Sequence, residues 1–232
     1  MPKDDSEYTP SLMERILLGT NESDVFIKVS SDFGNSLYEI SPLEFATVNL
    51  QGFTGRKMLG DMYISGTRVP FNGQYYSLGS TTVLDNSTFL GRDIDIQFDG
   101  TLPFPSFQRS YYSPTVSNLT FDGIVDYQLP KDSNLTIYWM PDSLYITERA
   151  LLIIEGEFRD GRADIEYRTI YKELNDKDGR FTFSVEELKS FHKFEMIRIN
   201  YAKGYSSTEL IEGKRVKFGF LNRNWATIRF AD

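Results

Sequence analysis

The sequence predicts an all-β protein made of two β-sandwich domains, and three observations support that fold class. Short segments alternate apolar and polar residues, which is the two-residue period of a half-buried strand. Asp-Gly pairs separate these segments at residues 99–100, 122–123, 160–161 and 178–179, and such pairs tolerate the positive φ of hairpin turns. Helix signals are scarce. Many short strands joined by frequent turns are typical of a β-sandwich or barrel.

The N-terminal half carries two clear strand patterns. The segment DVFIKVS, residues 24–30, places three apolar side chains on one face: Val25, Ile27 and Val29. Residues 92–99 place apolar side chains on one face and an acidic row on the other: Asp93, Asp95 and Asp99. We therefore expect each segment to bury one face only.

The C-terminal half continues the strand patterns. Residues 134–141, NLTIYWMP, place Trp139 on a buried face, and the apolar run ALLII at residues 150–154 is typical of a strand buried on both faces. The final segment, WATIRF, puts Ala226, Ile228 and Phe230 on one face. Trp225 is therefore expected on the opposite, exposed face. One short helical turn is expected from the capping box Ser184-Val-Glu-Glu187 through Phe191.

A proline-rich segment marks the expected domain boundary. Residues 103–114, PFPSFQRSYYSP, contain three prolines, which do not fit inside a central strand. We expect an N-terminal β domain over residues 14–108 and a C-terminal β-sandwich domain over residues 109–232. Residues 1–13 are polar and acidic with two prolines, and are expected to form a flexible tether.

Two features carry a resemblance to a known group of proteins. The first comprises FPSFQRSYYSP, then SNLTIYWMP at residues 133–141, then the ALLIIEGEF strand; the second is Lys3-Asp4-Asp5. The first resembles the immunoglobulin-like sandwich of secreted Bacteroidota proteins, although the paired cysteines of antibody domains are absent. The second is similar to the export signal after the acylated cysteine of Bacteroidota surface lipoproteins. The resemblance implies an immunoglobulin-like C-terminal domain and an extracytoplasmic protein at the outer membrane or cell surface, lipid-anchored in its precursor.

Composition excludes several classes of chemistry. The chain has no cysteine, so disulfides, zinc-thiolate sites and cysteine nucleophiles are impossible. It has one histidine, His192, which is too few for a multi-histidine metal site. The net charge of −8 repels phosphate backbones, so nucleic acid is not an expected partner. No apolar run approaches the ~20 residues that span a bilayer.

The acidic residues do not form a recognisable metal or catalytic motif. Side chains two apart on a strand lie about 7 Å apart, so the row at Asp93, Asp95 and Asp99 is interpreted as a solvated face. Residues 175–179, NDKDG, fail the calcium-loop pattern at its first and twelfth positions and are expected to form a hairpin turn. We expect no metal, no cofactor and no catalytic residue; His192 is expected at the surface or as a cap.

Aromatic residues outside the expected cores are the candidate ligand-binding residues. Exposed aromatic rings stack on the apolar faces of sugars. The candidates are Trp225 on the last strand, Tyr75 and Tyr76 after a turn, and Tyr111 and Tyr112 in the proline-rich segment. For each of them, packing under a loop or between domains is the alternative.

Together these features predict a non-catalytic extracytoplasmic binding protein that recognises a glycan or a surface protein. One alternative is a structural or accessory subunit of an outer-membrane complex, since unpaired edge strands dock easily. The other is a glycan hydrolase with two facing carboxylates, which sequence alone cannot pair.

Overall fold

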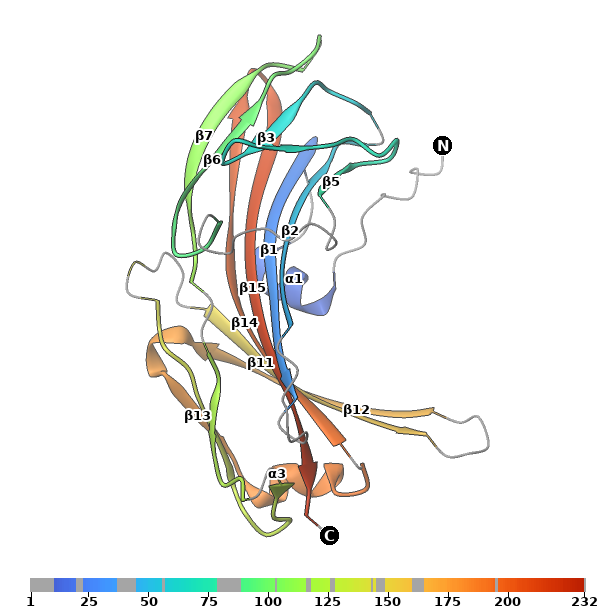
Figure 1. Cartoon of the computed structure of the whole chain (residues 1–232), viewed down its shortest axis with the longest axis vertical. Helices are drawn as coiled ribbons and strands as arrows, with labels where there is room; N and C mark the ends of the chain where they lie inside the picture. The colour runs from blue at the N-terminus through green and yellow to red at the C-terminus, as the bar shows by residue number, and fades with distance from the viewer. Residues whose placement is uncertain are drawn as a thin grey trace. The chain divides into compact units, whose positions relative to one another are not determined.

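A computed structural model gives the fold of the chain (Figure 1). It describes residues 11–19, 23–36, 45–55, 57–78, 89–102, 104–115, 118–125, 128–142, 144, 149–159, 165–194 and 196–231. The structure is all-β, as predicted, with short helical elements beside the strands. The helical elements are α1 (Leu12–Leu18), η1 (Asp176–Asp178), α3 (Val185–Leu188) and η2 (Lys189–Phe191).

The described strands form three sheets. The largest has the order β12-β11-β14-β15-β1-β2-β5, with β9 paired to β15: β12 (Ile165–Asn175), β11 (Arg149–Arg159), β14 (Met196–Ile211), β15 (Lys214–Phe230), β1 (Val25–Ser36), β2 (Phe45–Phe53), β5 (Tyr76–Leu78) and β9 (Gln128–Leu129). The second has the order β4-β3-β6-β7: β4 (Thr67–Val69), β3 (Met62–Ile64), β6 (Arg92–Phe98) and β7 (Phe107–Ser113). The third has the order β13-β10-β8: β13 (Arg180–Phe183), β10 (Leu135–Tyr138) and β8 (Thr120–Asp122).

The chain divides into two compact units that differ from the two predicted domains. Unit 1 comprises residues 1–31, 47–115 and 204–222, and unit 2 comprises residues 32–46, 116–203 and 223–232. Strands β14 and β15 are 16 and 17 residues long, far beyond the usual ~5–6 residues, and each contributes to both units. Because of these strands, neither unit is a continuous stretch of sequence.

The predicted boundary at residues 108–109 falls inside a strand. β7 pairs with β6 residue for residue from Arg92↔Ser113 to Phe98↔Phe107, so this segment belongs to unit 1. Pro105 and Pro114 flank β7 and do not interrupt it. The prolines therefore mark the ends of an extra strand, and the division between the units lies after Thr115.

Each unit has a hydrophobic core between two sheets. In unit 1 the apolar faces of β1 and β15 pack with those of β3 and β6; the predicted inward residues Val25, Ile27 and Val29 are all buried. In unit 2, alternate residues of β11, β14 and β15 pack with β10 and β13. Trp139 is buried there, as predicted, and residues 150–154 are buried on both faces.

Two local predictions were wrong. The expected tether ran to residue 13, but α1 begins at Leu12 and its residue Met13 is buried. Its capping box, in which Ser11 Oγ accepts from the backbone N–H of Glu14, is the same signal that correctly predicted α3 at Ser184. Residues 175–179 do not form a hairpin, because β13 pairs with β10 and not with β12; the turn carries η1 instead.

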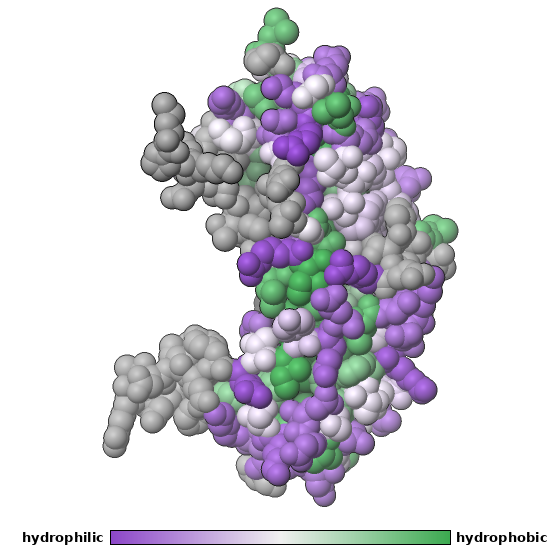
Figure 2. Space-filling model, turned by 180° about the vertical axis from the view of Figure 1, so that it is seen from behind, coloured by the Kyte–Doolittle hydropathy of each residue, from purple (hydrophilic) through white to green (hydrophobic). Residues whose placement is uncertain are grey.

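In the view of Figure 2, hydrophilic residues are interspersed with separate apolar patches. The large apolar residues exposed among those described are Leu12, Met58, Leu102, Val125, Met140, Leu144, Tyr171 and Leu210. Within the described part of the chain, every helix is too short to cross a bilayer.

Candidate functional site

The outer face of the large sheet in unit 2 carries the candidate site. We call it the Trp225 face and define it by five residues: Gly34, Glu155, Arg198, Asn200 and Trp225. They come from β1, β11, β14 and β15, so a rigid sheet holds them.

Strand alternation explains why these side chains share one face. On β15 the core-facing residues Ala226, Ile228 and Phe230 are buried, as predicted, which places Trp225 on the opposite side. Ile197 and Ile199 belong to the unit 2 core. Arg198 and Asn200 alternate with them along β14, so these two residues face outward with Trp225.

Glycine at position 34 makes room for the indole of Trp225. A Cβ atom built at Gly34 would lie 2.0 Å from Cε2 and 2.1 Å from Cζ2 of that ring. The ring therefore occupies the space that a side chain at position 34 would fill, an arrangement in which an aromatic residue covers a strand glycine. Trp225 is half-buried as a result and keeps part of its surface exposed.

Arg198 packs on the same indole. Its guanidinium carbon lies 5.2 Å from the ring centroid, which is within cation–π range. Arg198 itself is exposed. Stacking uses the face of the guanidinium and leaves its in-plane N–H groups available as hydrogen-bond donors.

A carboxylate lies directly across the strand pair from this arginine. In the β11–β14 register Glu155 is opposite Arg198, and directly opposed side chains have Cβ atoms about 5 Å apart. Asn200 Nδ2 donates to Glu155 Oε2 at 2.8 Å. The Trp225 face thus combines an aromatic ring, a cation, an anion and an amide within neighbouring strands.

Asn200 has an unsatisfied acceptor. The residue is 2% exposed, and its Oδ1 has no hydrogen-bond partner among the described residues. A buried carbonyl oxygen without a donor costs about 1–3 kcal/mol, so such a group normally accepts from a water or a ligand.

The structure gives Tyr75 and Tyr76 different roles. Tyr76 is 1% exposed; its hydroxyl donates to the Gly60 carbonyl at 2.5 Å and accepts from Leu59 N–H at 2.9 Å. Its side chain therefore has no surface to offer a ligand. Tyr75 is half-buried and stacks on Phe53 with ring centroids 5.4 Å apart. Both tyrosines belong to unit 1.

Tyr111 and Tyr112 also lie in unit 1 and are half-buried. The Tyr111 ring packs on Phe218 with centroids 4.6 Å apart, and its hydroxyl donates to Glu209 Oε1 at 2.5 Å. The carbonyl of Tyr112 accepts from Tyr205 at 2.5 Å. The contacts of Tyr111 tie β7 to β14 and β15, so packing, the alternative weighed for this residue, accounts for the position of its ring.

His192 lies at the end of η2, with its ring 5.0 Å from that of Phe230. Burial lowers the pKa of this imidazole, and Lys131 and Lys189 act in the same direction. The contact with Phe230 gives the imidazole a packing role. Within the described residues, no group of three or more histidine and acidic side chains is placed to bind a metal.

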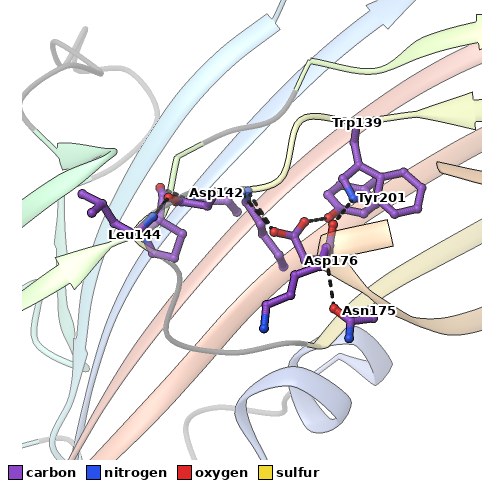
Figure 3. A network of polar contacts seen from close by, with 10 residues as sticks. Trp139, Asp142, Leu144, Asn175, Asp176 and Tyr201 are labelled. Atoms are coloured by element: carbon purple, nitrogen blue, oxygen red, sulfur yellow. Dashed lines mark hydrogen bonds and ion pairs between the residues drawn. The ribbon is translucent and has the colours of Figure 1, made fainter. Parts of the chain in front are cut away.

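Sequence reasoning missed a buried polar cluster in unit 2, shown in Figure 3. Asp176 is fully buried, and Tyr201 O–H donates to its Oδ1. Lys203 and Asp142 are buried beside it. The available signal was Lys203 inside the apolar strand RINYAKGY, where a lysine on the core-facing period needs a partner.

A scan against protein-family models gives no match to this sequence, and a search of curated proteins finds none with significant similarity.

Proposed function

We propose that the protein is a non-catalytic binding protein that recognises a carbohydrate on the Trp225 face. One observation carries the proposal: a half-buried indole, fixed by Gly34 and Arg198, lies on the same sheet face as Glu155 and Asn200. Sugars present apolar C–H faces to aromatic rings and hydroxyl groups to charged and amide side chains.

The charges on this face suit hydroxyl groups. Arg198 offers donors and Glu155 offers acceptors from directly opposed positions, so a hydroxyl can donate to one and accept from the other. Sheet-borne side chains also lose little conformational freedom on binding.

The cellular location is part of the same proposal. The resemblance at Lys3-Asp4-Asp5 and in the C-terminal half supports an extracytoplasmic protein at the outer membrane or cell surface, anchored by lipid in its precursor. Glycans are abundant ligands at such surfaces, which agrees with the chemistry of the Trp225 face.

A second function, assembly into an outer-membrane complex, has one observation in its favour. β12 is an 11-residue strand that has a neighbour on one side only among the described strands. An edge of this length can pair with a strand of another protein. The hydrolase alternative gains nothing from Asp142 and Asp176, because both acids are buried and cannot flank a substrate.

Titration of the protein with a broad panel of soluble polysaccharides by calorimetry tests the proposed function. We expect at least one glycan to bind, and Trp225→Ala to weaken it by about tenfold, which corresponds to losing about 1.4 kcal/mol of stacking. Tyr75→Ala is the matched control, because it removes a half-buried aromatic side chain from unit 1 and leaves the Trp225 face intact. No binding across the panel would contradict the proposal, as would equal effects of the two variants.

A further inference from the structure

We propose that the Trp225 face selects sugars that carry an anionic group, either a carboxylate or a sulfate ester, and that Arg198 binds this group. The inference rests on the proposed function, because it names the class of glycan that the same face recognises. It depends on how the charges of this face are paired.

Arg198 presents a cation without a counter-ion. The residue is exposed, and its guanidinium contacts the indole of Trp225. No carboxylate among the described residues forms an ion pair with it. Four other arginines at the surface each have such a partner: Arg68 with Asp61, Arg109 with Glu209, Arg149 with Glu173 and Arg223 with Asp32. Arg198 therefore keeps the donors that an anionic ligand requires.

The carboxylate opposed to Arg198 in the strand register is turned to an uncharged partner. Glu155 lies directly opposite Arg198, whereas Asn200 lies two residues further along β14, on the same face. Asn200 Nδ2 donates to Glu155 Oε2 at 2.8 Å, and Asn200 is 2% exposed, so surrounding atoms hold its amide in place. This bond draws the carboxylate toward Asn200. It explains why Glu155 and Arg198 are opposed in register and yet form no ion pair in the described part of the chain.

The charge balance of the face favours an anion. On β15, Arg223 and Arg229 face outward, because they alternate with the core residues. With Arg198 they place three cations on the outer surface of β14 and β15, against the carboxylates of Asp32 and Glu155 on the neighbouring strands β1 and β11. The whole chain carries a charge of −8 and repels polyanions, so the attraction of an anionic glycan depends on these local cations.

An anionic sugar fits both parts of the face. A guanidinium donates two parallel N–H bonds to a carboxylate or a sulfate, a geometry that the hydroxyl groups of a neutral sugar do not match. The indole accepts the apolar C–H face of the same sugar ring. Contact with Trp225 orients the Arg198 guanidinium before binding, which reduces the entropy lost on binding. Glu155 repels an anion on its own side, so the anionic group lies on the β15 side of Arg198.

Calorimetric titration with matched pairs of polysaccharides tests the inference. The carboxylated probes are polygalacturonate and alginate, each compared with its carboxyl-reduced form. The sulfated probes are dextran sulfate and carrageenan, each compared with its desulfated form. We expect the anionic member of at least one pair to bind at least about tenfold more tightly than its neutral form, because a hydrogen-bonded charge pair is lost in the latter. The pair that responds shows whether the anionic group is a carboxylate or a sulfate.

Three variants assign the effect to this face, measured with the anionic polysaccharide that binds. We expect Arg198→Gln to weaken its binding by about tenfold. Arg68→Gln is the matched control, because it removes the same charge from an exposed arginine of unit 1 and should leave binding unchanged. Glu155→Gln should strengthen binding, since it removes the repulsion of the anionic group. Circular dichroism confirms that each variant is folded.

The possible outcomes separate this inference from the proposed function. Neutral and anionic forms that bind equally well, with both weakened by Trp225→Ala, would overturn the inference and leave the proposed function in place. Equal weakening by Arg198→Gln and Arg68→Gln would show a diffuse attraction and would overturn the role of Arg198. No binding to any neutral or anionic polysaccharide would contradict both proposals.

Discussion

The indole of Trp225 occupies the space that a side chain at position 34 would need. A Cβ at Gly34 would lie 2.0 Å from the ring, closer than non-bonded atoms approach. Position 34 therefore requires glycine because the ring of Trp225 leaves no room for a side chain there. The backbone conformation does not itself require glycine, since its φ is not positive. The same contact orients the residue that we place at the centre of the binding face.

We expect Gly34→Ala to displace Trp225 and to lower the free energy of unfolding by about 1–3 kcal/mol, the usual cost of overpacking. Urea denaturation at equilibrium measures this loss. The control is a double-mutant cycle, because in a Trp225→Ala background the added methyl group meets no ring. An equal cost of Gly34→Ala in both backgrounds would show that the contact is not the cause.

We expect Tyr76→Phe to lower the free energy of unfolding by about 1–3 kcal/mol and to leave glycan binding unchanged. The buried hydroxyl of Tyr76 bonds to two backbone groups, at Leu59 and Gly60, which the variant leaves unsatisfied. Thermal denaturation and calorimetric titration of the same variant check the two parts. Tyr75→Phe removes a hydroxyl from the neighbouring half-buried ring and should cost less. A loss of glycan binding in Tyr76→Phe would show that Tyr76 contributes to the ligand site.

We expect Glu209→Gln to destabilise the protein at neutral pH and to have no effect in acid. Hydrogen bonds from Tyr111 and Arg109 lower the pKa of Glu209 below its ordinary value of 4.5. A depressed folded-state pKa stabilises the protein above the unfolded pKa, and that stabilisation is lost as pH falls through the folded value. Urea denaturation at a series of pH values measures the difference between wild type and variant. A difference that persists or grows in acid would contradict this assignment.

The fold class was predictable because it depends on patterns within single strands. Alternation correctly placed Val25, Ile27 and Val29 in one core and Ile228 and Phe230 in the other, and it correctly predicted that Ala226 is buried. The division into units was not predictable, because β14 and β15 run through both and strand pairing over long sequence separations leaves no local signal. The prolines around β7 indicated irregular backbone but could not show that the segment between them forms a strand.

The candidate site was predictable in part. The orientation of Trp225 followed from alternation, whereas its partners did not, because Gly34, Glu155 and Arg198 meet only through the order of the strands. Among the tyrosines, the burial of Tyr76 depends on tertiary contacts with Gly60 and Leu59. The polar cluster at Asp176 was missed for the same reason: its residues come from three separate segments.

The two tryptophans allow a direct test of the central claim, which is that Trp225 binds the glycan. The Trp139 indole N–H is buried and donates to Asp176, so its NMR signal reports on the core, whereas Trp225 lies at the surface. ¹H–¹⁵N correlation spectra are recorded while a polysaccharide that binds the protein is added. We expect the indole N–H signal of Trp225 to shift until binding is saturated and that of Trp139 to stay in place. Saturable binding with an unmoved Trp225 signal would contradict the account.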